Sequence, residues 1–147
     1  MIKRAVVTLV IVLLSSTNIY AQGYRHIEIF SINQDKVVKV VQSTSEIQKL
    51  AVNYLEGIEG VYGKFDPVPS NGYAIKIPLE SPVKIQGRWL NAFVDEVIII
   101  FPEQEDPFLM IFENENRLVC FTFKGNTDAL LNSLDFELNT TFELISN

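Results

Sequence analysis

Side chains that could carry out catalysis are few in this sequence. The chain of 147 residues holds one histidine, His26, and one cysteine, Cys120. A serine or cysteine hydrolase needs a base beside its nucleophile, usually histidine, and a tetrahedral zinc site needs several closely spaced Cys or His ligands. His26 follows Arg25, whose charge disfavours an imidazolium, and Cys120 lies within the apolar run LVCFTF. We therefore predict a structural or exposed His26 and a buried, unreactive Cys120.

Carboxylates are the remaining catalytic groups, and they form two clusters in the sequence. Glu103, Glu105 and Asp106 make the first cluster, and Glu113 and Glu115 make the second. A strand predicted between them would hold the clusters at opposite ends of a sheet, so they cannot build one glycosidase pair or one calcium site. The first cluster lacks the EF-hand pattern, and the chain has no Walker loop or dinucleotide fingerprint. We predict solvated turn charges, no metal, no cofactor and no enzymatic activity.

Four residues are candidates for a binding surface. Tyr62 and Phe65 lie in the glycine- and proline-rich segment 59–72, for which no regular element is predicted. Connections of this length are often functional, but loop aromatics also fill satellite clusters, and pinning of the loop to the sheet is the favoured interpretation. Arg88 and Trp89 belong to the residue types most enriched at interface hot spots. A strand can also use this pair to pack a ring and keep a charge in solvent, and this structural role is the favoured interpretation.

The start of the chain has the three parts of a secretory signal. Lys3 and Arg4 form a cationic start, residues 5–14 are apolar apart from one threonine, and a polar stretch leads to Ala21. The apolar run is too short for a spanning helix, which needs about 20 residues. We predict cleavage after Ala21, one domain over residues 22–147 and a secreted or extracytoplasmic location. An uncleaved anchor is the alternative, and it is the one route by which the membrane would be contacted.

Charge and cysteine content limit the partners and the source of stability. The formal net charge is −6, which disfavours binding to nucleic acid and to anionic lipid surfaces. The negative net charge is compatible with a cationic partner or with divalent cations. A single cysteine cannot form an internal disulfide, so the fold must be held by its hydrophobic core.

Periodicity predicts an α+β domain with an antiparallel sheet of five to seven strands and two helices. Alternation predicts a hairpin over residues 25–42. Ser43 and Glu46 form a capping box before an apolar helical stripe that ends near Gly57. From Tyr73 onward the chain predicts strands joined by tight polar turns, with a turn or a bulge at Gly87, and then a short helix over 126–134.

Two predicted strands, VIIIF and FLMIF, are apolar at every position. A half-buried strand alternates, so both faces of these strands must be covered. Burial within the domain is the default, and self-association is the alternative.

The order of hairpin, capped helix, long loop, meander and short helix resembles small secreted or lipid-anchored domains of Gram-positive bacilli that have no assigned activity. The segments that carry this resemblance are SINQDKVVKVVQSTSEIQKL, GYAIKIP, EVIIIFP and PFLMIFENENRLVCFTF. The similarity is one of layout, not of a diagnostic motif. It implies export and the same fold, and it transfers no site residue.

The sequence thus predicts a non-enzymatic extracytoplasmic binding or accessory module that acts through protein contacts. This function requires an exposed apolar patch or an oligomer. A small-molecule or cation-binding sensor domain is the alternative, and it requires a concave pocket near Tyr62 and Phe65. A carboxylate-dependent hydrolase comes third, and it requires two carboxylates about 5–10 Å apart in a cleft.

Overall fold

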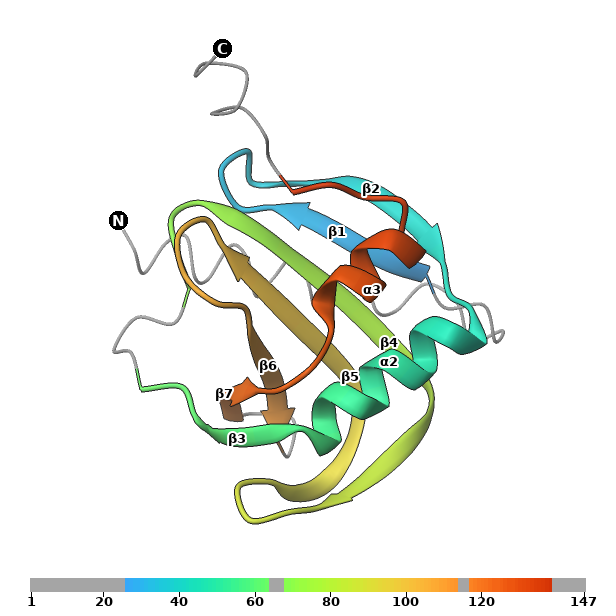
Figure 1. The fold of residues 1–147 in the computed structure, drawn as a ribbon, viewed down its shortest axis with the longest axis vertical. Coiled ribbons are helices and arrows are strands. Elements are labelled where there is room, and N and C mark those ends of the chain that lie inside the picture. Colours follow the sequence, from blue (N-terminus) through green and yellow to red (C-terminus); the bar gives the residue numbers. More distant parts are fainter. Residues whose placement is uncertain (1–25, 64–67, 114–116, 139–147) are drawn as a thin grey trace.

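The computed structural model of the chain describes residues 26–63, 68–113 and 117–138. These residues form one antiparallel sheet of seven strands and two helices (Figure 1), which confirms the predicted α+β single domain. The strands are β1 (His26–Ser31), β2 (Lys36–Gln42), β3 (Ile58–Val61), β4 (Gly72–Gln86), β5 (Asn91–Pro102), β6 (Phe108–Glu113) and β7 (Arg117–Phe123), and the helices are α2 (Ser45–Glu56) and α3 (Thr127–Ser133). The predicted signal, residues 1–21, lies outside the described ranges. Within those ranges no helix is long and apolar enough to cross a membrane.

The strands follow the order β2-β1-β4-β5-β6-β7-β3 across the sheet. Strands β4 to β7 make the predicted meander, and β1–β2 is the predicted hairpin. Strand β4 is longer than expected, because it continues past Pro78 with a change of register between Pro78 and Val83. The turn at Gly87 is confirmed: the Gly87 N–H donates to the Leu90 carbonyl at 2.8 Å.

Helix α2 begins one residue later than the sequence pattern indicates. The N-cap is Thr44, whose hydroxyl accepts a hydrogen bond from the Ile47 N–H at 3.2 Å. The predicted capping role of Ser43 is therefore wrong, since Ser43 instead accepts from the side-chain amide of Gln48 at 2.8 Å. The backbone of Thr44 is extended, which is the geometry that aims a cap oxygen at the first helical turn. For α3, the N-cap is Asn126, whose side chain accepts a hydrogen bond from the Ala129 N–H at 3.1 Å.

The segment 59–72 is only partly a loop. Residues Ile58–Val61 form β3, which pairs with β7 at the end of the sheet. The Lys124 N–H donates to the Gly57 carbonyl at 2.9 Å, and the Tyr62 N–H donates to the Cys120 carbonyl at 2.8 Å. The strand IEGV is short, and Glu59 and Gly60 separate its two β-forming residues, so its pairing with β7 is needed to stabilise it.

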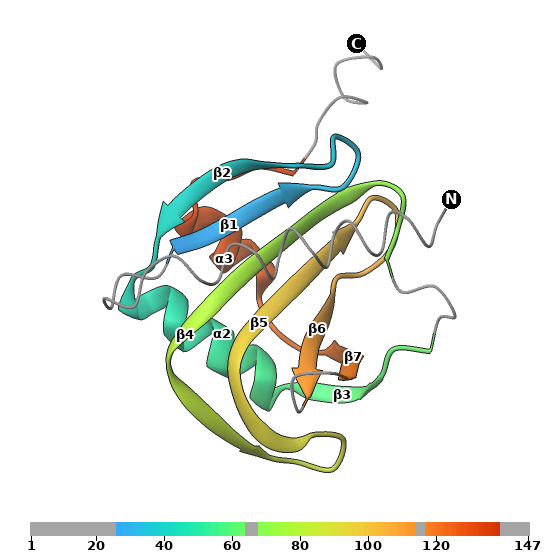
Figure 2. The ribbon, with the colours of Figure 1, turned by 180° about the vertical axis from the view of Figure 1, so that it is seen from behind.

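Both helices lie on one face of the sheet (Figures 1 and 2). The helix-facing core joins the inward residues of the central strands, such as Ile29, Ile75 and Ile99, to Ile47 and Leu55 of α2. The opposite face has its own buried cluster, formed by Phe30, Val68, Ala74, Ile98, Ile100, Phe108, Met110 and Cys120. Residues 97–101 of β5 and 108–111 of β6 are buried on both faces of the sheet. Both helices lie on one face, so they do not divide the covering of the two faces between them, and burial of the other face within the domain stays a prediction.

Tyr54 connects the two helices and supports a first test. Its ring is fully buried and its hydroxyl donates to the Asn126 carbonyl at 2.7 Å. Tyr54→Phe should lower the free energy of unfolding by about 1 kcal/mol, measured by urea denaturation, because that hydrogen bond is lost. Tyr73→Phe keeps the edge-on ring contact with Phe136 and is the control, with an expected change below about 0.5 kcal/mol. Equal losses in both variants would contradict the assigned role of the hydroxyl.

The same residue predicts a pH dependence. Burial, with a smaller contribution from the negative charge of Asp128, raises the pKa of Tyr54 to about 12. The folded chain therefore keeps the Tyr54 phenol protonated at pH values above the pKa of the unfolded chain. The stability that this protonation adds is complete below about pH 10. That stability is lost as the pH rises from about 10 through 12. The Tyr54→Phe variant should lose less stability over that interval than the wild type.

Candidate functional site

The predicted binding residues Arg88 and Trp89 lie in the turn between β4 and β5. This hairpin extends past the neighbouring strands and curls beneath α2 (Figure 1). Trp89 is 43% exposed, and the Arg88 guanidinium lies 5.3 Å from the centre of its ring. Such a cation–π contact is worth about 0.5–1 kcal/mol at an exposed site. The structure thus presents the pair at the surface of a hairpin tip.

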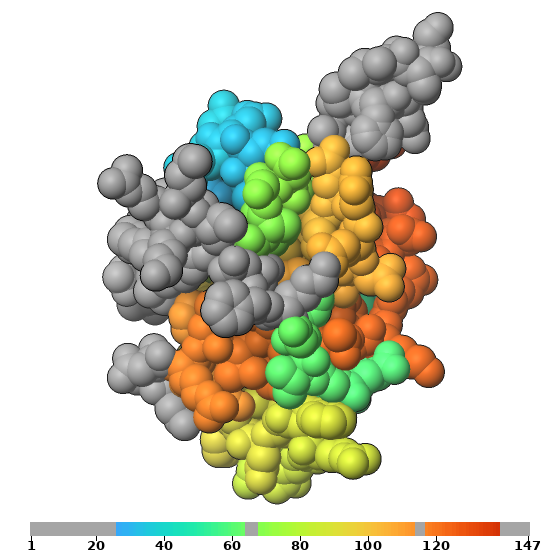
Figure 3. Space-filling model, turned by 90° about the vertical axis from the view of Figure 1, so that its left-hand side faces the viewer, coloured from blue at the N-terminus to red at the C-terminus, as the bar shows by residue number. Residues whose placement is uncertain are grey.

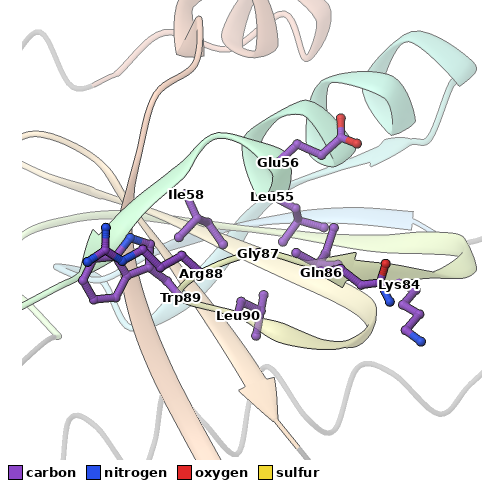
Figure 4. Close-up of a pocket in the computed structure, with 10 residues that line it drawn as sticks. Leu55, Glu56, Ile58, Lys84, Gln86, Gly87, Arg88, Trp89 and Leu90 are labelled. Carbon is purple, nitrogen blue, oxygen red and sulfur yellow. The ribbon is translucent and has the colours of Figure 1, made fainter.

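A small pocket opens beside this turn, with a volume of about 180 Å³ (Figure 4). Its floor is apolar, because Leu55, Ile85 and Leu90 are all buried. The remaining lining side chains come from the end of α2, the first residue of β3 and the hairpin: Glu56, Ile58, Lys84, Gln86, Arg88 and Trp89. We call this the tip pocket. It joins an apolar floor to an aromatic wall and a charged rim.

The charged groups at the tip pocket are one cation and one carboxylate. Arg88 and Glu56 line it, whereas the ammonium of Lys84, another lining residue, lies 5.6 Å from the centre of the Phe93 ring. The chain as a whole carries a net charge of −6. A pair of opposite charges beside an apolar floor can guide a partner to one orientation more than it adds affinity.

A second exposed ring lies on the outer face of the same hairpin. Phe93 is 68% exposed and is paired across the strands with Lys84, whose ammonium lies 5.6 Å from the ring centre. Phe93 and Lys84 were not identified from the sequence. Alternation in β5 was the available signal, because Val94 beside Phe93 is buried and neighbouring residues of a strand face opposite ways.

The other two predicted binding residues do not join this site. Tyr62 is partly buried and stacks on Phe108 with ring centres 3.9 Å apart. The hydroxyl of Tyr62 lies 3.5 Å from a carboxylate oxygen of Glu105. This confirms the interpretation that the ring pins its segment to the sheet. Tyr62 is not a lining residue of the tip pocket, and Phe65 lies outside the described residues.

The titratable groups singled out from the sequence lie apart from one another. Glu103, Glu105 and Asp106 are exposed in the turn before β6, whereas Glu113 ends that strand and lies 3.8 Å from Arg117. The two carboxylate turns are therefore separated by β6, as predicted, with Glu115 outside the described residues. Among the residues that the structure describes, no group of three or more His, Cys, Asp or Glu side chains could hold a metal ion.

One buried ion pair is structural. Lys76 is 1% exposed, and its ammonium lies 3.0 Å from a carboxylate oxygen of Glu28, its cross-strand neighbour on β1. The two side chains share the face of the sheet opposite to the helices, and neither lines the tip pocket. A charge buried in this way must be paired, so loss of Glu28 would leave the Lys76 ammonium buried without this partner.

Cys120 is buried, as predicted, with 8% of its surface exposed. Burial raises the pKa of its thiol to about 11. The thiolate is the reactive form, so the thiol should react at least about tenfold more slowly in the folded chain at pH 8 than in the urea-unfolded chain. Ellman's reagent measures this, and the folded rate should climb only as the pH approaches 11. A folded rate equal to the unfolded rate at pH 8 would contradict the burial argument.

Fold and site together define a class: a single-domain α+β protein with an open antiparallel sheet, two helices on one face and an exposed aromatic–basic hairpin tip. Comparison of the chain with protein-family models, curated protein sequences and solved structures gives no match. What the protein does must therefore be argued from its own geometry.

Proposed function

We propose that this domain is a non-enzymatic binding module that acts outside the cytoplasm through protein contacts. The observation that carries the proposal is the exposed Arg88–Trp89 pair beside the tip pocket. Arginine and tryptophan beside a pocket with a desolvated floor are the usual composition of an interface hot spot. The extracytoplasmic location is taken from the signal-like residues 1–21.

Pocket size favours a protein partner over a small ligand. Sites for small molecules and cofactors enclose about 300–1,000 Å³. The tip pocket has about 180 Å³, close to the roughly 150 Å³ of a cavity that accommodates benzene. It suits one apolar side chain of a partner better than a whole ligand. The sensor-domain alternative would also place its pocket near Tyr62, which does not line this one.

The carboxylate-dependent hydrolase is less well supported. Such an enzyme needs two carboxylates about 5–10 Å apart in a cleft. The lining residues of the tip pocket include a single carboxylate, Glu56. Its chemistry suits recognition of a partner more than acid–base catalysis on a sugar or ester.

The test is a pull-down with a tagged chain of residues 22–147 from the native envelope and culture medium, read by mass spectrometry at several salt concentrations. The double variant Arg88→Ala, Trp89→Ala is run in parallel. The proposal expects a specific, saturable partner that the double variant loses. Recovery of the bait alone, or equal capture by the double variant, would count against the proposal.

A further inference from the structure

The face of the sheet without helices is buried, although few described residues lie over it. Ile98 and Met110 point to this face from β5 and β6 and are 1% and 0% exposed. Lys76, the cross-strand neighbour of Ile98, is also 1% exposed. Side chains stand roughly upright on a sheet, so neighbouring strands cover their flanks and leave their tips exposed. Because this burial arises within one chain, other residues of the same chain must cover the tips.

The described residues provide the cover at one end of this face only. Tyr62 stacks on Phe108, the first residue of β6. The Ile32 N–H donates to the carbonyl of Gly72, the first residue of β4. Strands β4 and β6 begin at the same end of the sheet, since both run antiparallel to β5. The described apolar residues of this face all lie on strands, apart from Ile32, Tyr62 and Val68.

The other described elements do not pass over this face. Both helices lie on the opposite face (Figure 2). The hairpin of β4 and β5 lines the tip pocket together with Leu55 and Glu56 of α2, so it turns toward the helices. Strand β3 lies directly beside that hairpin in the space-filling view (Figure 3) and pairs edge to edge with β7. The remaining cover must therefore come from residues outside the described ranges.

Length and position favour the N-terminal residues as this cover. From β1 to β7 the face is about 20 Å wide, because its five strands lie about 4.8 Å apart. Residues 64–67 and 114–116 are too short to cross it, since four residues extend over about 13 Å at most. Residues 139–147 follow Leu138, which packs on the helix-facing core, so they leave from the wrong face. Residues 1–25 lead directly into β1, beside β4.

Composition and reach agree with this choice. Residues 5–14 have the sequence AVVTLVIVLL, in which threonine is the one polar residue. Ten residues are about 15 Å long as a helix and about 33 Å long as a strand, so either form spans much of the face. Residues 15–25 extend over about 36 Å at most, which is enough to bring the apolar run to any part of the face. Burial of one apolar surface against the other is favourable.

We infer that in the uncleaved chain the apolar run 5–14 docks on the helix-free face of the sheet. The inference gives each face of the doubly apolar strands β5 and β6 its own cover: the helices on one side and the N-terminal run on the other. Cleavage after Ala21 would then uncover an apolar face that includes Ile98 and Met110. The shortened domain would gain an interaction surface separate from the tip pocket.

The experiment compares the whole chain, produced without export so that residues 1–21 are kept, with residues 22–147. Both carry Cys120→Ser and one reporter cysteine, either Ile98→Cys or Ile99→Cys. The reporters replace the same residue type at adjacent buried positions of β5 that face opposite sides of the sheet. Ellman's reagent should label Ile98→Cys at least about tenfold faster in residues 22–147 than in the whole chain. Ile99→Cys should be labelled equally slowly in both.

A second pair of variants tests the N-terminal run within the whole chain. The double variant Val10→Asp, Leu13→Asp places two charges in the apolar run and should speed the labelling of Ile98→Cys at least about tenfold, because a buried charge without a partner is costly. The matched variant Ser15→Asp, Ser16→Asp adds the same charge beyond the apolar run and should leave the labelling rate unchanged.

Three outcomes would overturn the inference. Equal protection of Ile98→Cys in both chains would place the cover within residues 22–147, and equally fast labelling in both would show that nothing covers the face. Protection in the whole chain that is lost on dilution would identify a second copy as the occupant. If shortening also speeds the labelling of Ile99→Cys, the fold itself is loosened, and the aspartate variants of the whole chain decide. The pull-down tests the proposed function separately, because it depends on Arg88 and Trp89.

Discussion

Replacing Gly72 by alanine is expected to lower the free energy of unfolding by about 3 kcal/mol or more. Gly72 has φ of +127°, a conformation that residues with a side chain rarely adopt. A Cβ at this position would overlap the Phe101 carbonyl oxygen and lie 3.1 Å from the Pro102 Cα. Both neighbours are backbone atoms of β5, so no side chain can rotate away. The substitution would have to displace the start of β4.

The position of Gly72 in the sheet would make a displacement of its backbone damaging. Strand β4 pairs with β1 on one side and β5 on the other. The Gly72 N–H donates to the Asn33 side chain at 2.8 Å, and its carbonyl accepts from the Ile32 N–H at 2.9 Å. Moving Gly72 therefore disturbs three strands at once.

Urea denaturation monitored by circular dichroism measures this effect, with Gly63→Ala as the matched control. A Cβ at Gly63 meets nothing within 4 Å, so its change should stay within about 0.5 kcal/mol. An equally small change at Gly72 would show that the start of β4 can relax, contrary to the backbone overlap described above.

Trp89→Ala is expected to weaken the binding of a captured partner by about 30-fold or more. A tryptophan at the centre of an interface is typically worth at least about 2 kcal/mol on truncation, which corresponds to that factor. The variant removes the aromatic wall of the tip pocket and the surface on which Arg88 stacks. Because Trp89 is 43% exposed in the free domain, its loss should change stability far less than affinity.

Isothermal titration calorimetry with the purified partner measures this loss, and Val40→Ala is the control. Val40 is an exposed apolar residue on β2, at the far edge of the sheet, so its truncation should leave the affinity unchanged. Trp89→Phe, which keeps a ring in the wall, should retain part of the affinity. Unchanged affinity in Trp89→Ala would place the interface elsewhere on the domain.

Elements stabilised by local interactions were predictable from sequence. The stripe of α2, the β1–β2 hairpin and the turn at Gly87 each depend on residues close together in the chain. The cap of α2 was predicted one residue early, because Ser43 and Thr44 are both good capping residues and only the backbone conformation distinguishes them. Patterns of this kind indicate that an element exists more reliably than where it begins.

The site was only half predictable. Arg88 and Trp89 were recognisable by residue type, but the pocket beside them combines the end of α2, the start of β3 and the tip of a distant hairpin. Strand β3 itself was missed, since IEGV becomes a strand only through its pairing with β7. Neither the pocket nor the strand has a signature within any short window of sequence.

By itself, the sequence determined the fold class, the apolar character of both faces of the central strands and the scarcity of catalytic side chains, because these follow from local periodicity and composition. Tertiary structure alone decided that Tyr62 stacks on Phe108, that Arg88 and Trp89 line a pocket, and that the first residue of β3 lines it too. The physical reason is that these features depend on contacts between segments far apart in the chain. The energies of such contacts are set by packing geometry, which residue type and spacing do not specify.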